Sequence, residues 1–171
     1  MIYTAIDFET ADNKHDSACA IGLVKIQDNM IIDTYYKLIK PPRSYIKYAY
    51  FHGITWDMLK NQANFAELWH EIAAFTQNSS AFIAHNAQFD KNILYGTAEA
   101  YHIEIPPIPF YCTLKAARKF LNLPKNSLDS VCQALNIELN HHHALSDAHA
   151  CANIFLYFAR QGISLDNCIT K

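Results

Sequence analysis

The first forty residues of the chain carry the apolar runs of β-strands. We predict strands over residues 2–9, 18–26 and 30–39. The connection at 27–29 is short enough to join the second and third strands as an antiparallel hairpin. The proline pair at 41–42 ends the third strand, because proline has no N–H group to donate to a sheet.

Further along the chain, apolar residues recur at helical spacing. Phe65, Leu68, Ile72 and Phe75 predict a helix over residues 65–76. Other helices are expected at 55–59, 89–101, 113–121, 127–135 and 145–160, and short strands at 81–84 and 110–111. Strands followed by mixed strand–helix units predict an α/β fold with a central mixed five-stranded sheet flanked by helices. We place this domain at 1–162, followed by a loose C-terminal tail at 163–171.

Composition narrows the class of protein without naming a reaction. The 171 residues can bury a substantial core, and the net charge of −2 argues against wrapping nucleic acid by charge alone. A locally basic groove is still compatible with that charge. Five scattered cysteines without a CxxC pair are expected to be reduced thiols. Because neither a signal peptide nor a membrane-length apolar run is visible, we expect a cytoplasmic protein without a membrane partner.

Asp7 and Glu9 are the first candidates for chemistry. Residues two apart on a strand point to the same face, so these two carboxylates lie side by side while Phe8 points the opposite way. Adjacent carboxylates repel each other unless a cation lies between them. For an isolated Asp-x-Glu pair, however, a solvated strand end is the ordinary explanation.

Two further acids lie at the N-terminal ends of apolar helix stripes. Asp147 is aligned with Cys151 and Ile154, and Asp90 is aligned with Ile93. An unpaired carboxylate on such a face costs on the order of several kcal/mol. A salt bridge could satisfy either acid alone, but a shared metal centre explains both together.

The ligand types indicate which metal this centre would hold. Four carboxylates suit two Mg²⁺ or Mn²⁺ ions better than zinc, and such a pair holds both oxygens of an in-line phosphoryl displacement. His142, on the loop five residues before Asp147, is the candidate general base. Consecutive loop residues point in different directions, so we read His141 and His143 as exposed or supporting residues.

Three motifs in this order resemble the DEDDh branch of the DEDD 3′–5′ exonucleases. They are Asp7-Phe8-Glu9-Thr10, the segment from His85 to Asp90, and the segment from His142 to Ala148. That branch includes the epsilon proofreading subunit of bacterial DNA polymerase III, ribonuclease T and oligoribonuclease. The resemblance covers most of the chain and implies a ribonuclease H-like fold that releases nucleoside 5′-monophosphates from 3′ ends.

The resemblance also implies residue roles. Asp7, Glu9, Asp90 and Asp147 would bind the metal ions, and His142 would activate water. The substrate-binding candidates are Phe8, Thr10, His52, Asn86 and Phe89. The chain departs from proofreading subunits at Phe8, where these usually have threonine, and at Lys47, where they have an acid. A polymerase partner is possible, but no docking segment is visible, so the resemblance favours a stand-alone member.

Two acid-free intervals are candidate paths for the substrate. The interval between Asp33 and Asp57 mixes lysine and arginine with six tyrosine and phenylalanine residues, the composition of a single-strand path. We favour it, and within it Lys40 and Arg43 as substrate-binding residues. The second interval, residues 105–128, carries the basic residues Lys115, Arg118 and Lys119.

The leading hypothesis is therefore a 3′–5′ exonuclease acting on single-stranded 3′ ends, with DNA favoured over RNA. One rival is an exoribonuclease that trims RNA in the manner of ribonuclease T or oligoribonuclease. The second is a non-catalytic module that binds DNA ends, but no metal acid has been lost. A ribonuclease H-like endonuclease would give no reason for His142 at this spacing.

Overall fold

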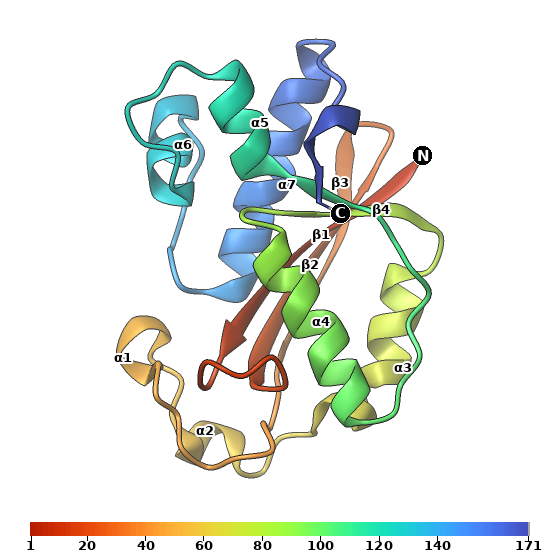
Figure 1. Ribbon diagram of the computed structural model, residues 1–171, viewed down its shortest axis with the longest axis vertical. Coiled ribbons are helices and arrows are strands. Elements are labelled where there is room, and N and C mark those ends of the chain that lie inside the picture. Colours follow the sequence, from red (N-terminus) through yellow and green to blue (C-terminus); the bar gives the residue numbers. More distant parts are fainter. Residues whose placement is uncertain (171) are drawn as a thin grey trace.

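The computed structural model describes residues 1–170 as a six-stranded mixed sheet with helices on both faces (Figure 1). The strand order is β3-β2-β1-β4-β5-β6. The strands are β1 (Ile2–Thr10), β2 (Ala18–Gln27), β3 (Met30–Leu38), β4 (Ser79–Ala84), β5 (Phe110–Cys112) and β6 (Ile169–Thr170). The first three strands pair antiparallel, β4 is parallel to β1, β5 is parallel to β4, and β6 is antiparallel to β5.

The helices form two layers. They are α1 (Ala49–His52), α2 (Trp56–Leu59), α3 (Phe65–Thr76), α4 (Gln88–Ala100), α5 (Thr113–Phe120), α6 (Leu128–Leu135), α7 (Ala144–Arg160) and the 3-10 helix η1 (Asp166–Cys168). Helices α5, α6 and α7 share one apolar cluster with one face of the sheet, and α3 and α4 share another with the opposite face. No helix within residues 1–170 is both long and apolar enough to cross a bilayer.

The α/β fold is confirmed, and the helix over residues 65–76 has the predicted bounds. The prediction of five strands is wrong, because Ile169 and Thr170 pair with β5 as a sixth. This segment had been expected to be a loose tail, yet Leu165 and Cys168 are buried against the α5–α7 side. Lys171 lies outside the described residues. The short helix α1 was not predicted.

The fold brings three segment ends to one edge of the sheet. Strand β1 runs past the end of its pairing with the parallel strand β4, and the chain after β4 turns into α4. Helix α7 begins where β2 carries Gly22, which is paired with Asp7 in the register of β1 and β2. A Cβ atom at Gly22 would overlap the carbonyl group of Ala144 and lie 2.5 Å from the nitrogen of Leu145. Only glycine therefore allows α7 to begin this close to the acids.

Candidate active site

Four carboxylates that are far apart in the sequence converge at this edge. Ligand oxygens of Asp7, Glu9 and Asp147 all lie within 4.8 Å of one another. Asp90 completes the group, and its Oδ1 accepts a hydrogen bond of 3.2 Å from the backbone N–H of Phe8. The structure thus brings together all four acids that the sequence singled out.

Local structure aims these carboxylates at a common point. The pairing of β1 with β2 is irregular between Glu9 and Thr10, where the strand leaves the regular sheet. Asp90 and Asp147 each lie in the first turn of a long helix, α4 and α7 respectively. The positive end of a helix dipole favours a carboxylate there.

The crowding of the acids changes their protonation. Burial, together with the negative charges of Asp90, Asp147 and Glu9, raises the pKa of Asp7 well above its usual value. Burial also raises the pKa of Asp90 and of Asp147, and burial with the nearby Asp147 charge raises the pKa of Glu9 to about 7. Such a group is unstable as four bare anions near neutral pH.

A divalent cation fits this donor set. The ligands are hard carboxylate oxygens, the type that Mg²⁺ and Mn²⁺ prefer. Asp147 Oδ1 is buried and has no hydrogen-bond partner within the described residues. Because a buried acceptor without a partner is costly, this oxygen is available as a ligand for a bound cation.

Two neighbouring histidines contact the acids in different ways. His141 Nδ1 lies 3.0 Å from Asp147 Oδ2, and the backbone N–H of His142 donates to the same oxygen at 3.3 Å. The two rings stack with centroids 4.0 Å apart. The side chain of His142 lines a pocket together with Glu9, whereas His141 lines the neighbouring groove with Asp7 and Asp147. His142 has a φ of 65°, the left-handed backbone conformation, and ligand atoms of His141, His142 and Asp147 lie within 4.8 Å of one another.

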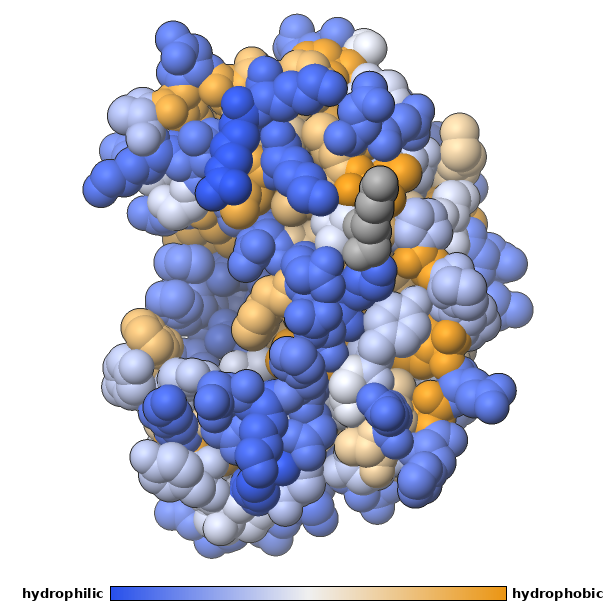
Figure 2. Space-filling model, in the orientation of Figure 1, coloured by the Kyte–Doolittle hydropathy of each residue, from blue (hydrophilic) through white to orange (hydrophobic). Residues whose placement is uncertain are grey.

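The pocket beside Glu9 is mainly aromatic. Its lining residues are Glu9, Thr10, Tyr48, Phe51, His52, Phe89 and His142. Phe51 and Phe89 are 53% and 44% exposed, so their rings are available for stacking on a base. Figure 2 shows a hollow at the left edge of the molecule, between the part that carries α5 and α6 and the part that carries α1. The elements that line the site border this hollow (Figure 1).

His52 lines this pocket but has no free ring nitrogen. The N–H of Ile54 donates to its Nδ1 at 3.0 Å, so Nε2 carries the proton and donates to the carbonyl oxygen of Thr10 at 3.2 Å. Burial lowers the pKa of His52, which agrees with a neutral ring. His52 therefore fastens the α1 segment to the end of β1 and presents only its ring surface to the pocket.

The other substrate-binding candidates differ in whether they reach the acids. Phe8 is 3% exposed and packs in the core between the sheet and α3–α4, so only its backbone N–H reaches the site. Phe8 was predicted to be a substrate-binding residue, and the burial of its side chain leaves only its backbone near the acids. Thr10, Asn86 and Phe89 do line the pockets at the acids. Lys40 lines none of the pockets that contain the acids, and its backbone N–H donates to the carbonyl oxygen of Ala63.

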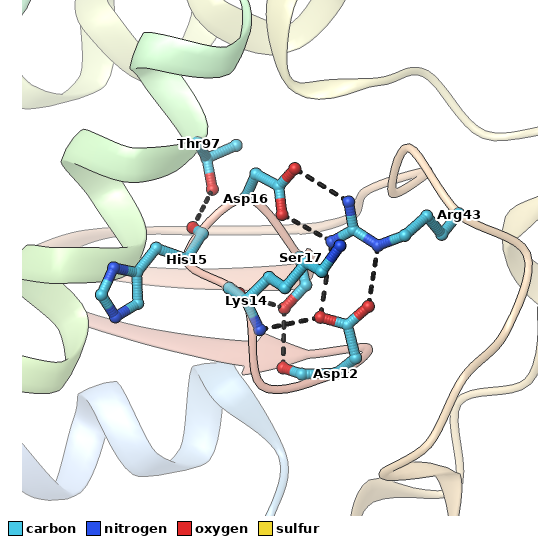
Figure 3. A network of polar contacts seen from close by, with 7 residues as sticks. All are labelled: Asp12, Lys14, His15, Asp16, Ser17, Arg43 and Thr97. Atoms are coloured by element: carbon cyan, nitrogen blue, oxygen red, sulfur yellow. Dashed lines mark hydrogen bonds and ion pairs between the residues drawn. The ribbon is translucent and has the colours of Figure 1, made fainter.

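Arg43 is committed to a structural network (Figure 3). Its guanidinium pairs with Asp12 through a 2.8 Å contact of Nε and with Asp16 through a 2.8 Å contact of Nη1. Thr97 of α4 donates to the carbonyl oxygen of His15 at 3.0 Å, and His15 lies in the β1–β2 loop with Asp12 and Asp16. Arg43 thus anchors the β1–β2 loop, and the expectation that it binds phosphate is wrong because two carboxylates already occupy its donors.

Several residues that line the site were not among the substrate-binding residues chosen from the sequence. Tyr48 and Phe51 belong to the favoured interval but were not singled out. Arg118 and Lys125 line the groove that contains Asp7 and Asp147. Both lie in the second acid-free interval, which had been ranked below the first. The helical spacing of Lys115 and Arg118 was the available signal.

This fold and site define a ribonuclease H-like hydrolase domain with an acidic centre for divalent cations. The model of the exonuclease family RNase_T matches residues 4–155. The chain belongs to this exonuclease family, as the three motifs predicted.

Curated relatives agree with that assignment. A DNA polymerase III PolC-type protein of Thermotoga petrophila is 38% identical over 160 residues, which cover 91% of this chain and 12% of that protein. DNA polymerase III subunit epsilon of Buchnera aphidicola subsp. Baizongia pistaciae is 29% identical over 163 residues, covering 89% of this chain and 66% of that protein. The chain thus spans only a small part of the PolC-type relative.

Solved structures share the fold. Exonuclease X in complex with 5′ overhanging duplex DNA superimposes with a TM-score of 0.77 at 21% identity, covering 97% of this chain and 96% of that one. A 3′-exonuclease described as recognising the 3′ end of histone mRNA stem-loop gives 0.76 at 15% identity, covering 94% and 82%. These likenesses confirm the ribonuclease H-like architecture.

Proposed function

We propose that this chain is a 3′–5′ exonuclease that hydrolyses terminal phosphodiester bonds of single-stranded DNA and releases nucleoside 5′-monophosphates. The observation that carries the proposal is the convergence of Asp7, Glu9 and Asp147 within 4.8 Å beside the buried Asp90. The same arrangement is what a two-metal phosphoryl displacement requires.

The four acids would hold two divalent cations, Mg²⁺ or Mn²⁺. Bound there, the cations would supply charge neutralisation for the phosphate and lower the pKa of the attacking water. The orphaned Asp147 Oδ1 and the raised pKa values of the acids support this assignment.

His142 would act as the general base. Its position in the pocket with Glu9 supports this role, whereas His141 would orient Asp147 through their 3.0 Å contact. Burial and the neighbouring His141 lower the pKa of His142, so its ring is neutral and able to accept a proton near pH 7. Phe51 and Phe89 would stack on the terminal base, and Thr10 would contact the terminal nucleotide.

The preference for DNA rests on the relatives, which are named as DNA polymerase III proteins. An RNA-trimming activity remains the second candidate, because the same fold occurs in the exonuclease described with histone mRNA. A polymerase partner is suggested only by the names of the relatives. A purely non-catalytic end-binding module would not need four retained metal acids.

Digestion of matched DNA and RNA oligonucleotides, labelled at either the 3′ or the 5′ end, tests the proposal. With Mg²⁺ or Mn²⁺ we expect early release of the 3′ label as a mononucleotide and stepwise shortening of the 5′-labelled DNA. Asp7→Ala should abolish both while the protein stays folded. Internal cleavage of the 5′-labelled strand, or an Asp7→Ala variant as active as the wild type, would refute the proposed 3′–5′ exonuclease activity. Faster digestion of RNA than of DNA would show that RNA is the preferred substrate.

A further inference from the structure

A basic groove leads away from the acids on the side opposite the aromatic pocket. Its first part is lined by Asp7, Asp147, Arg118 and Lys125, together with the polar residues Asn126 and Ser127. Its second part, beyond Arg118, is lined by Lys115 and the β6 strand. The two parts are continuous, because Asn86, Leu114 and Arg118 line both.

Among residues 1–170, the lysine and arginine side chains of this groove form no ion pair with a carboxylate. Within residues 1–170 the side-chain ion pairs of lysine and arginine involve Lys37, Arg43 and Lys60, none of which lines the groove. Arg118, Lys115 and Lys125 are exposed and form none. Lys115 and Arg118 lie one turn apart on α5, and Lys115 Nζ donates to the carbonyl oxygen of Ile169 at 3.0 Å. None of the described residues that line the second part of the groove is acidic.

The loop that carries Lys125 is held in place by a histidine that the proposed chemistry does not use. His85 Nε2 donates to the carbonyl oxygen of Asn126 at 2.9 Å, and the hydroxyl of Thr113 lies 2.9 Å from His85 Nδ1. Burial lowers the pKa of His85 to about 4, so the ring stays neutral and the hydroxyl can donate to it. His85 thus ties the loop to the end of β4 and the start of α5.

We propose that this basic groove binds the backbone phosphates of the strand on the 5′ side of the scissile bond, with Arg118 and Lys125 as the main contacts and Lys115 beyond them. The inference rests on the proposed function and adds the direction of the substrate. The terminal base has aromatic partners on the Glu9 side of the acids, whereas the rest of the strand is a series of anions and finds its cations on the α5 side.

The length dependence of hydrolysis tests this proposal. A dinucleotide with a free 5′ hydroxyl carries only the scissile phosphate, whereas a hexanucleotide also carries upstream phosphates. For wild-type protein we expect kcat/KM to be at least tenfold higher for the hexanucleotide. The double variant Arg118→Gln/Lys125→Gln should lose this gain, so that its value for the hexanucleotide falls to within about twofold of its value for the dinucleotide. Lys119→Gln, on the same helix but outside both parts of the groove, is the matched control and should behave as wild type.

Two further readouts separate phosphate binding from a merely structural role. The slope of log(kcat/KM) against log(salt) for the hexanucleotide should fall by about 0.7 for each contact removed. A neutral methylphosphonate at the second linkage from the 3′ end should slow the wild type and leave the double variant unaffected. An unchanged hexanucleotide rate in the double variant, or an equal loss on the dinucleotide, would overturn the proposal. Wild-type protein that hydrolyses neither substrate would instead refute the proposed function on which it rests.

Discussion

The clearest physical consequence of the site is that its acids destabilise the protein when no divalent cation is bound. Glu9 is 9% exposed, and burial beside Asp147 raises its pKa from 4.5 to about 7. Between these two pH values the native protein keeps a proton that the unfolded chain has lost. Stability therefore falls with rising pH across this window, by about 1.4 kcal/mol per pH unit. The accumulated loss is about 3 kcal/mol above pH 7.

Glu9→Gln removes this loss, because glutamine resembles the protonated carboxyl group and carries no charge. In the presence of a chelator at pH 8, we expect the variant to unfold in urea with a free energy about 3 kcal/mol higher than that of the wild type. At pH 5 the gain should shrink to below about 1 kcal/mol, since native Glu9 is then already protonated. Glu99→Gln, at an exposed position of α4, is the control and should show no such pH dependence.

Saturating Mg²⁺ should reverse the order at pH 8. Bound cation stabilises the native wild type by mass action, and the variant has one ligand fewer, so it gains less. Urea titrations at pH 5 and pH 8, each with chelator and with Mg²⁺, measure the difference in unfolding free energy between the variant and the wild type under all four conditions. A variant that is equally or less stable than the wild type at pH 8 without metal would show that Glu9 is not a crowded, desolvated carboxylate, and the electrostatic reasoning would fail.

Three further predictions concern the residues around the acids. His142→Ala should lower single-turnover hydrolysis by roughly 10²–10⁴, the usual loss for a general base, and His141→Ala should have a smaller effect; the opposite ranking would make His141 the base. Gly22→Ala should displace the start of α7. Because a shift of about 1 Å can lower a rate by about 10², we expect kcat to fall about a hundredfold. A near-normal kcat would show that the position of Asp147 does not depend on this close approach. Arg43→Gln should destabilise the protein by about 1–3 kcal/mol at pH 7 and leave the salt dependence of kcat/KM unchanged. Urea titration measures the first effect and a salt series measures the second. Unchanged stability or a weaker salt dependence would contradict the structural role of Arg43. Because Arg43 lowers the pKa of Asp12 and of Asp16, this destabilisation should fade as the pH falls through those lowered values.

The sequence determined the features that depend on local periodicity. Alternation along β1 placed Asp7 and Glu9 on one face, and helical spacing placed Asp90 and Asp147 at the beginnings of α4 and α7. The helix over residues 65–76 follows from its apolar stripe. In each case neighbours within a turn or a few residues set the conformation, so the pattern was readable without knowing the rest of the fold.

Tertiary structure decided the features that depend on which distant groups meet. Arg43 resembled a phosphate ligand in the sequence, but the β1–β2 loop brings Asp12 and Asp16 to its guanidinium. Arg118 had the lower rank, yet the packing of α5 places it in the groove that contains Asp7, without an ion-pair partner among residues 1–170. A charged side chain is neutralised by the partner that the fold brings within a few ångströms, and the sequence states only that the charge exists. The same holds for β6, because two residues form a strand only where β5 offers an open edge.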